Sequence, residues 1–170
     1  MSRNRILLRR TIEEAEGYSE LGMNEHALRA LQRRGALVHG NGRACYLLGE
    51  TLRELHRYEE ALLPLERSAD LIPDDIQVML ALAWCYKRTG QLAKAIESLE
   101  RAVQVDASEA VLHYNLACYW SLARNRTLAL RYLSRALEID ANFRDLVPDE
   151  PDFNPLRHDP DFISLTGAIA

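Results

Sequence analysis

The sequence has too few cysteines, too widely spaced, for a disulfide framework or a cysteine zinc site. Cys45, Cys85 and Cys118 are an odd number and form no Cys-x-x-Cys pair, whereas both kinds of site need paired cysteines. We therefore expect free, buried thiols. The histidines show no His-Glu-x-x-His motif or other paired ligand spacing. The sequence predicts no metal site and no cofactor.

Long apolar runs and an excess of basic charge are also missing. The start, MSRNRILLRR, holds only three consecutive apolar residues, too few for a signal-peptide core or a membrane span. Taking Met1 as the native start, we expect a cytoplasmic protein with no membrane partner. The 21 Lys and Arg face 25 Asp and Glu, a net charge of −4. Nucleic acid is not an expected partner, because phosphate binding requires a positive field.

Proline and glycine are sparse, at 6 and 8 of 170 residues, which predicts a mostly helical chain. The length suits one compact domain or one short repeat array. No glycine-rich phosphate loop or serine-hydrolase elbow is present. The sequence therefore predicts no catalytic residues.

What the sequence does have is a residue pattern that repeats every 34 positions without a gap. The repeats cover 8–41, 42–75, 76–109 and 110–143, and positions are counted from the first residue of each. Position 20 is always alanine and position 24 always leucine, as follows: Ala27, Ala61, Ala95 and Ala129; Leu31, Leu65, Leu99 and Leu133. This spacing places both positions on one face of a helix.

The first half of each repeat is also helical in pattern, with a small residue at position 8 in all four repeats. These residues are Ala15, Gly49, Ala83 and Ala117. A small residue at position 8 facing the alanine at position 20 lets two antiparallel helices approach closely. Gly22 and Gly90 stand at position 15, where a turn is needed. The pattern predicts eight helices in four hairpins.

This pattern resembles the tetratricopeptide repeat family, whose 34-residue units form helix hairpins. The likeness rests mainly on these residues: Leu48, Gly49, Tyr58, Ala61, Leu65 and Pro73; Leu82, Ala83, Tyr86, Gly90, Ala95, Leu99 and Ala102; Leu116, Ala117, Ala129, Leu133 and Ala136. The resemblance implies an all-α, right-handed α-solenoid of four hairpins. The first repeat, 8–41, is degenerate, since Glu14 and Arg34 replace apolar or small residues, as a terminal repeat with a solvated face tolerates.

Residues 144–170 break the period and contain four of the six prolines. Apolar residues still recur among them, and Asp159-Pro160 is a good start for a short helix. We interpret this segment as a C-terminal cap of short helical turns over the fourth hairpin. Phe153 and Phe162 of this segment are predicted to be largely buried.

For function, the resemblance implies a non-catalytic adaptor, co-chaperone-like protein or assembly factor. Such a protein holds a peptide or helix of a partner in the concave groove of the array. Positions 2, 5, 9, 12 and 13 of the first helices would line this groove. The predicted site comprises Tyr46, Glu50, Arg53, Gln77, Leu80, Trp84, Lys87, Arg88, Tyr114 and Cys118. Tyr46, Trp84 and Tyr114 would form an aromatic floor, and Lys87 and Arg88 would meet acidic groups.

Three other interpretations remain open at this point. Trp84 could fill a gap between neighbouring helices and bind nothing. The array could associate with another copy of itself into a homo-oligomer, which the mass in solution would reveal. The chain could also be an enzyme using a groove thiol such as Cys118, which alkylation would inactivate.

Chaperone-binding members of the family hold a peptide carboxylate in a clamp of basic residues from three consecutive repeats. This clamp is absent here, whether it is aligned with the first three or the last three repeats.

Overall fold

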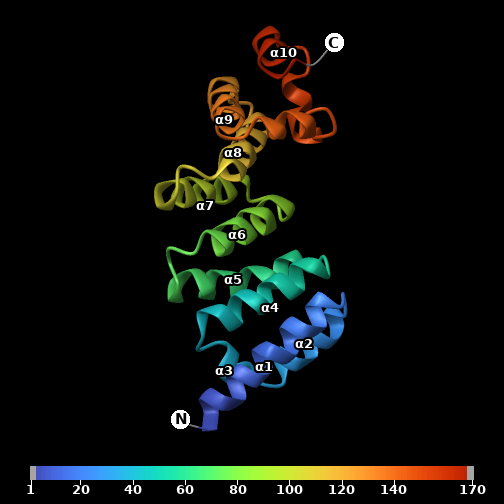
Figure 1. The fold of residues 1–170 in the computed structure, drawn as a ribbon, viewed down its shortest axis with the longest axis vertical. Coiled ribbons are helices and arrows are strands. Elements are labelled where there is room, and N and C mark those ends of the chain that lie inside the picture. The colour runs from blue at the N-terminus through green and yellow to red at the C-terminus, as the bar shows by residue number, and fades with distance from the viewer. Residues whose placement is uncertain (1–2, 168–170) are drawn as a thin grey trace. The chain divides into compact units, whose positions relative to one another are not determined.

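The computed structural model describes residues 3–167, which form helices joined by short turns (Figure 1). The α-helices are α1 (Arg3–Glu20), α2 (Asn24–Gln32), α3 (Gly35–Val38), α4 (Gly42–Glu54), α5 (Tyr58–Leu71), α6 (Ile76–Arg88), α7 (Leu92–Val105), α8 (Ala110–Leu122), α9 (Arg126–Ile139) and α10 (Pro160–Thr166). Two 3₁₀-helices, η1 (Ala141–Leu146) and η2 (Pro151–Leu156), precede α10. The described residues contain no strand, so the all-α class is confirmed.

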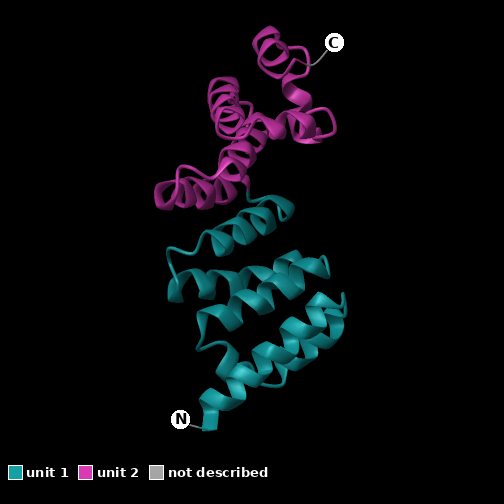
Figure 2. Ribbon diagram, viewed as in Figure 1, with its two compact units in different colours: residues 1–91 teal, residues 92–170 magenta. Residues whose placement is uncertain are grey.

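The chain divides into two compact units, residues 1–91 and 92–170 (Figure 2). Unit 1 contains α1 to α6, with the hairpins α1–α2 and α4–α5 and with α6 packed on α5. Unit 2 contains α7 to α10, with α7 packed on α8 and with the hairpin α8–α9. The division falls at the turn inside the predicted third repeat, 76–109. No helix within residues 3–167 is long and apolar enough to cross a membrane.

The hairpin α4–α5 shows why small residues recur in the pattern. A Cβ atom added to Gly49 would lie 2.4 Å from Cγ of Leu65, which is fully buried. Real Cβ atoms do not approach another carbon so closely. The two helices can therefore cross at this distance only because residue 49 is glycine. Ala61 on the facing helix is likewise fully buried. Small residues at these positions set the distance between the two helices.

The turn inside each repeat uses a left-handed backbone at position 15. Gly22 and Gly90 have φ values of 70° and 76°, as glycine allows. His56 and Arg124 occupy the same position in the other two repeats and adopt φ values of 59° and 60°. The turn geometry is therefore kept where the glycine is lost. These two non-glycine residues accept local strain.

Side-chain caps fix several helix starts. The Asp75 carboxylate accepts hydrogen bonds from the N–H groups of Gln77 and Val78 at the start of α6, at 2.9 and 3.3 Å.

The first repeat departs from the predicted pattern at both ends. Its first helix begins at Arg3 rather than near residue 8, and the short helix α3 stands between α2 and α4.

The tail after α9 closes unit 2 with an aromatic cluster. Phe153 and Phe162 are fully buried, with ring centroids 5.4 Å apart, as the sequence predicted. Asp159 caps α10 through bonds from the N–H groups of Asp161 and Phe162. Its carboxylate also accepts hydrogen bonds from Arg126 at the start of α9. The tail is thus held to unit 2 by both apolar packing and charge.

Candidate functional site

Among the predicted groove residues of unit 1, Trp84 has the most exposed large apolar side chain. It is 42% exposed, whereas Val78, Met79, Leu82 and Tyr86 on the same helix are buried. A large aromatic side chain left open on a helix whose other large apolar residues are mostly covered is a feature of binding surfaces. We refer to the predicted groove residues of unit 1 on α4 and α6 as the Trp84 face: Tyr46, Glu50, Arg53, Gln77, Leu80, Trp84, Lys87 and Arg88.

Two cations of α6 lie near aromatic rings in unit 1. The Lys87 ammonium is 5.8 Å from the centre of the Trp84 ring. The Arg88 guanidinium lies 5.1 Å from the ring of Tyr58, at the start of α5. Lys87 therefore belongs to the surroundings of Trp84, whereas Arg88 is turned towards α5.

On α4, a charged network surrounds the hydroxyl of Tyr46. Arg53 donates two hydrogen bonds to Glu50, at 2.8 and 3.0 Å, and a third to Glu54 at 2.6 Å. Burial and the nearby Glu50 carboxylate raise the pKa of Tyr46 to about 12. Its phenol therefore stays protonated at neutral pH and serves as a hydrogen-bond donor. The network gives this part of the face a fixed polar edge.

A hollow of 470 Å³ opens between α1 and α4 in the first part of unit 1. Arg43 and Glu16 form an ion pair across it, with Nη2 and Oε1 2.6 Å apart. The residues lining it are Arg5, Leu8, Arg9, Ile12, Glu13, Glu16, Asn41 and Arg43. Arg9, Ile12, Glu16 and Arg43 occupy positions 2, 5 or 9, so the pattern of groove positions identifies them. They were nevertheless absent from the site predicted above, which was centred on the aromatic residues.

The expectation that Tyr114 and Cys118 line an open groove is wrong, because both side chains are buried. Tyr114 is 5% exposed and Cys118 is 2% exposed. The ring of Tyr114 packs against Phe143 and against the edge of Phe153, with centroids 5.1 and 5.7 Å apart. The helix η2 of the chain's own tail packs on α8. The tail therefore covers two of the ten residues that were predicted to line the groove.

The tail also brings two carboxylates next to Cys118. Ligand-type atoms of Cys118, Glu150 and Asp152 lie within 4.8 Å of one another. The Glu150 carboxylate already accepts the N–H of Asp152 and so caps η2. Burial, Cys118 and these carboxylates raise the pKa of Tyr114, whose hydroxyl has no hydrogen-bond partner among the described residues. Spacing rules could not reveal this group, because its members come from separate segments.

All three cysteines are buried and none forms a disulfide within the described residues, as expected from the sequence. The thiol of Cys45 contacts the carbonyl oxygen of Val38 at 3.2 Å. Burial raises the pKa of Cys85 to about 11. Because the thiolate is the nucleophile, a buried thiol with a raised pKa is poorly suited to catalysis.

Comparison with known proteins agrees with this geometry. Residues 52–117 match the tetratricopeptide repeat family. This part of the chain is therefore similar to tetratricopeptide repeat proteins. This family is a protein-interaction fold and generally not an enzymatic one. The sequence matches no curated protein.

Solved structures of tetratricopeptide repeat proteins share the fold of this chain. A crystal structure of MamA is 20% identical, with 81% of each chain covered and a TM-score of 0.75. MamA from Desulfovibrio magneticus RS-1 is 22% identical, covering 79% of this chain and 76% of that one, with a TM-score of 0.74. YrrB, described as having an unusual peptide-binding site, is 23% identical, covering 79% and 70%, with a TM-score of 0.74. At these identities the likeness shows the fold alone.

Proposed function

We propose that this protein is a non-catalytic interaction module whose Trp84 face binds a segment of a partner protein. The observation that carries the proposal is the 42% exposure of Trp84 beside the Lys87 ammonium. Tryptophan buried at an interface is often a hot spot, because it contributes a large apolar area and a polar N–H. The peptide-binding site named for YrrB supports the same use of this fold.

Unit 2 provides an internal example of what such a face accepts. Tyr114 and Cys118 stand at positions 5 and 9 of their repeat, as Tyr46 and Glu50 do in unit 1. In unit 2 these positions are covered by η2, which buries Phe153, a residue preceded by Glu150 and Asp152. The chain's own tail thus behaves as an intramolecular ligand of the helix face. By analogy, the partner segment has an aromatic residue next to Asp or Glu.

The charges of the Trp84 face suit such a segment on its α6 side. An aromatic side chain would pack on the Trp84 ring, and a neighbouring carboxylate would meet Lys87. On the α4 side, Arg53 already neutralises Glu50 through two hydrogen bonds. Repulsion of an acidic segment by Glu50 is therefore reduced. The partner chemistry that we expect is aromatic and acidic, not basic.

The test uses a peptide of residues 147–158, VPDEPDFNPLRH, with a fluorescent label, added to the full chain. Saturable binding measured by anisotropy is the expected result. Trp84→Ala should weaken it by about 2 kcal/mol or more, which is about thirty-fold. Lys87→Ala should weaken it less, because it removes a charge at a partly exposed site.

The matched control is Leu63→Ala, because Leu63 is 69% exposed on α5 and is not part of the Trp84 face. This variant should bind the peptide as the unaltered chain does. A peptide carrying Phe153→Ala should bind poorly to every variant. Equal binding by the Trp84→Ala and Leu63→Ala variants would contradict the proposal. A peptide-induced increase in mass to that of a dimer would favour self-association instead.

A further inference from the structure

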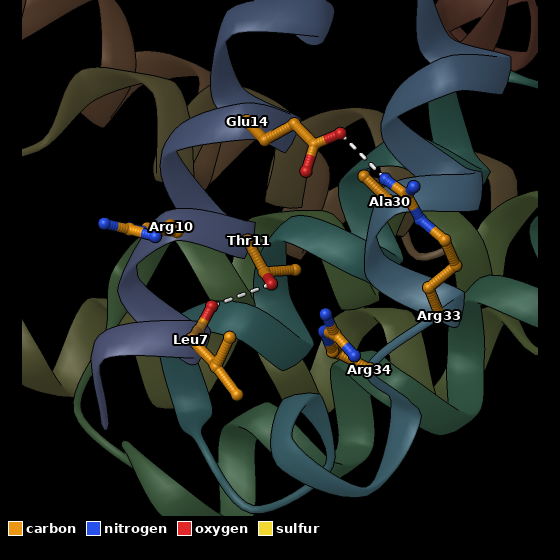
Figure 3. Close-up of a pocket in the computed structure, with 7 residues that line it drawn as sticks. All are labelled: Leu7, Arg10, Thr11, Glu14, Ala30, Arg33 and Arg34. Atoms are coloured by element: carbon orange, nitrogen blue, oxygen red, sulfur yellow. Dashed lines mark hydrogen bonds and ion pairs between the residues drawn. The ribbon is translucent and has the colours of Figure 1, made fainter. Parts of the chain in front are cut away.

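A second hollow in unit 1 is lined by arginine and shares no residue with the Trp84 face. It has a volume of 440 Å³ and lies in the first repeat (Figure 3). Thr11 and Ala30 are buried beneath it, and charged residues form its rim. We call it the arginine pocket; it is lined by Leu7, Arg10, Thr11, Glu14, Ala30, Arg33 and Arg34.

The pocket exists because the first repeat departs from the pattern at two packing positions. Glu14 stands at position 7 and Arg34 at position 27. The other three repeats bury an uncharged residue at each of these positions: Leu48, Leu82 and Leu116 at position 7; Ser68, Ala102 and Ala136 at position 27. Charged side chains cannot fill a helix contact as these residues do, so a hollow is left. Glu14 and Arg34 therefore weaken the packing of the first repeat, and packing alone gives no reason for charged residues at these positions.

The pocket has more positive than negative charge. Three guanidinium groups line it with one carboxylate, Glu14. Arg33 Nη2 donates to Glu14 Oε1 at 2.7 Å, and both side chains remain substantially exposed. Among the described residues, Arg34 forms no ion pair. Figure 3 shows the Arg34 guanidinium beside Thr11 and the Arg33 guanidinium turned towards Glu14, with Arg10 pointing away from both.

We propose that the arginine pocket binds a phosphate monoester. Arg33 and Arg34 outnumber the single Glu14 carboxylate, and Arg10 adds a positive charge at the rim, so the net positive charge suits the negative charge of a monoester at pH 7. Arginine presents paired N–H donors that fit phosphate oxygens. Arg34 is the primary contact, and Arg33 joins it by releasing Glu14. Glu14 therefore acts as an internal competitor for the ligand.

The experiment measures binding of O-phosphoserine to the full chain by calorimetry at constant ionic strength. Saturable binding is expected. Arg34→Ala should weaken it about ten-fold or more, because charged hydrogen bonds are lost. Glu14→Gln should strengthen it several-fold, because the competing carboxylate is removed. Arg9→Gln is the control, since Arg9 is an exposed arginine on the same helix that pairs with Glu13 outside the pocket.

Stability separates loss of the ligand site from loss of the fold. Alanine is the residue that two other repeats bury at position 27. Arg34→Ala should therefore leave the melting temperature unchanged or raise it, while binding is lost. A lower melting temperature would move the test to Arg33→Gln, which changes an exposed side chain and should also weaken binding. Unchanged binding in both variants would overturn the proposal.

The source of the phosphate is distinguished by the choice of probe. A phosphoserine-containing peptide and glucose 6-phosphate carry the same group on a protein and on a metabolite. Tighter binding of the phosphopeptide than of O-phosphoserine indicates a modified protein as the ligand, and tighter binding of the sugar phosphate indicates a metabolite. Serine and glutamate should both fail to bind at the same concentrations. Glutamate binding as tightly as O-phosphoserine, or no saturable binding of any probe, would overturn the proposal.

Discussion

The same helix face is closed in unit 2 and open in unit 1. In unit 2, Tyr114 and Cys118 are covered by the chain's own tail, and Phe153 is fully buried. In unit 1, the corresponding face of α4 and α6 leaves Trp84 42% exposed. In unit 2 this face holds an added segment, and within residues 3–167 the chain covers the face in this way in unit 2 alone. The open face of unit 1 is therefore where we expect a partner.

The largest effect should come from removing the aromatic side chain that closes unit 2. Phe153→Ala should lower the free energy of unfolding by about 3–5 kcal/mol, because Phe153 is fully buried against Tyr114 and Phe162. Chemical denaturation measures this change. Phe143→Ala is the control and should cost less, since Phe143 is only partly buried. Equal effects of the two variants would mean that the tail does not close unit 2 through Phe153.

A smaller effect is expected at the close helix contact in unit 1. Gly49→Ala should cost about 1–3 kcal/mol, because the new Cβ would lie 2.4 Å from Leu65. Gly17→Ala is the matched variant, since no atom lies within 4 Å of its added Cβ. It should stabilise α1 by about 0.5–1 kcal/mol, as alanine does in helix interiors. Thermal unfolding of both variants tests whether the change in stability comes from the close contact with Leu65 or from replacing a helical glycine in general.

The strained turns allow a comparison between units at a still smaller scale. Arg124 has a φ of 60°, so Arg124→Gly should stabilise unit 2 by up to about 1 kcal/mol. His56→Gly should gain less in unit 1, because Nδ1 of His56 lies 2.8 Å from the Tyr58 hydroxyl and that contact would be lost. Melting temperatures of the two variants measure the difference. A larger gain for His56→Gly would contradict this explanation.

The smallest effect should be the pH dependence of the ion pair that anchors the tail. Hydrogen bonds from Arg126 hold the pKa of Asp159 below its usual value. The pair therefore contributes stability fully above the unfolded pKa of about 3.9, and the contribution is lost as the pH falls through the lower folded value. Arg126→Gln should melt earlier than the unaltered chain at pH 7, with the difference shrinking at acidic pH. A constant difference would exclude Asp159 as the titrating group.

The repeat fold could be predicted from the sequence because each hairpin is specified by local residues. Ala61 and Leu65 mark the buried face of α5, and Asp75 marks the start of α6. The burial of Phe153 and Phe162 could also be predicted, since the last hairpin otherwise exposes apolar surface. These features depend on short-range periodicity and on simple rules of burial.

The details of the sites depend on contacts between distant segments, which the repeat does not encode. Position 9 was expected to face the groove, but at Cys118 the tail occupies that side. The path of the tail depends on its turns and prolines, and no period describes it. For the arginine pocket, the sequence indicated only that Glu14 and Arg34 replace apolar or small residues in the first repeat. Its hollow shape becomes evident from the positions of α1 and α2.

The most direct test of the central claim is to observe Trp84 itself while the peptide binds. In a Trp120→Phe background, Trp84 is the only tryptophan, because the chain has two. Its emission maximum and its quenching by iodide are then measured with and without a saturating amount of the 147–158 peptide. We predict a shift to shorter wavelength and protection from iodide, because the ring becomes buried under an aromatic side chain. Peptide binding that leaves both the emission and the quenching of Trp84 unchanged would contradict the claim.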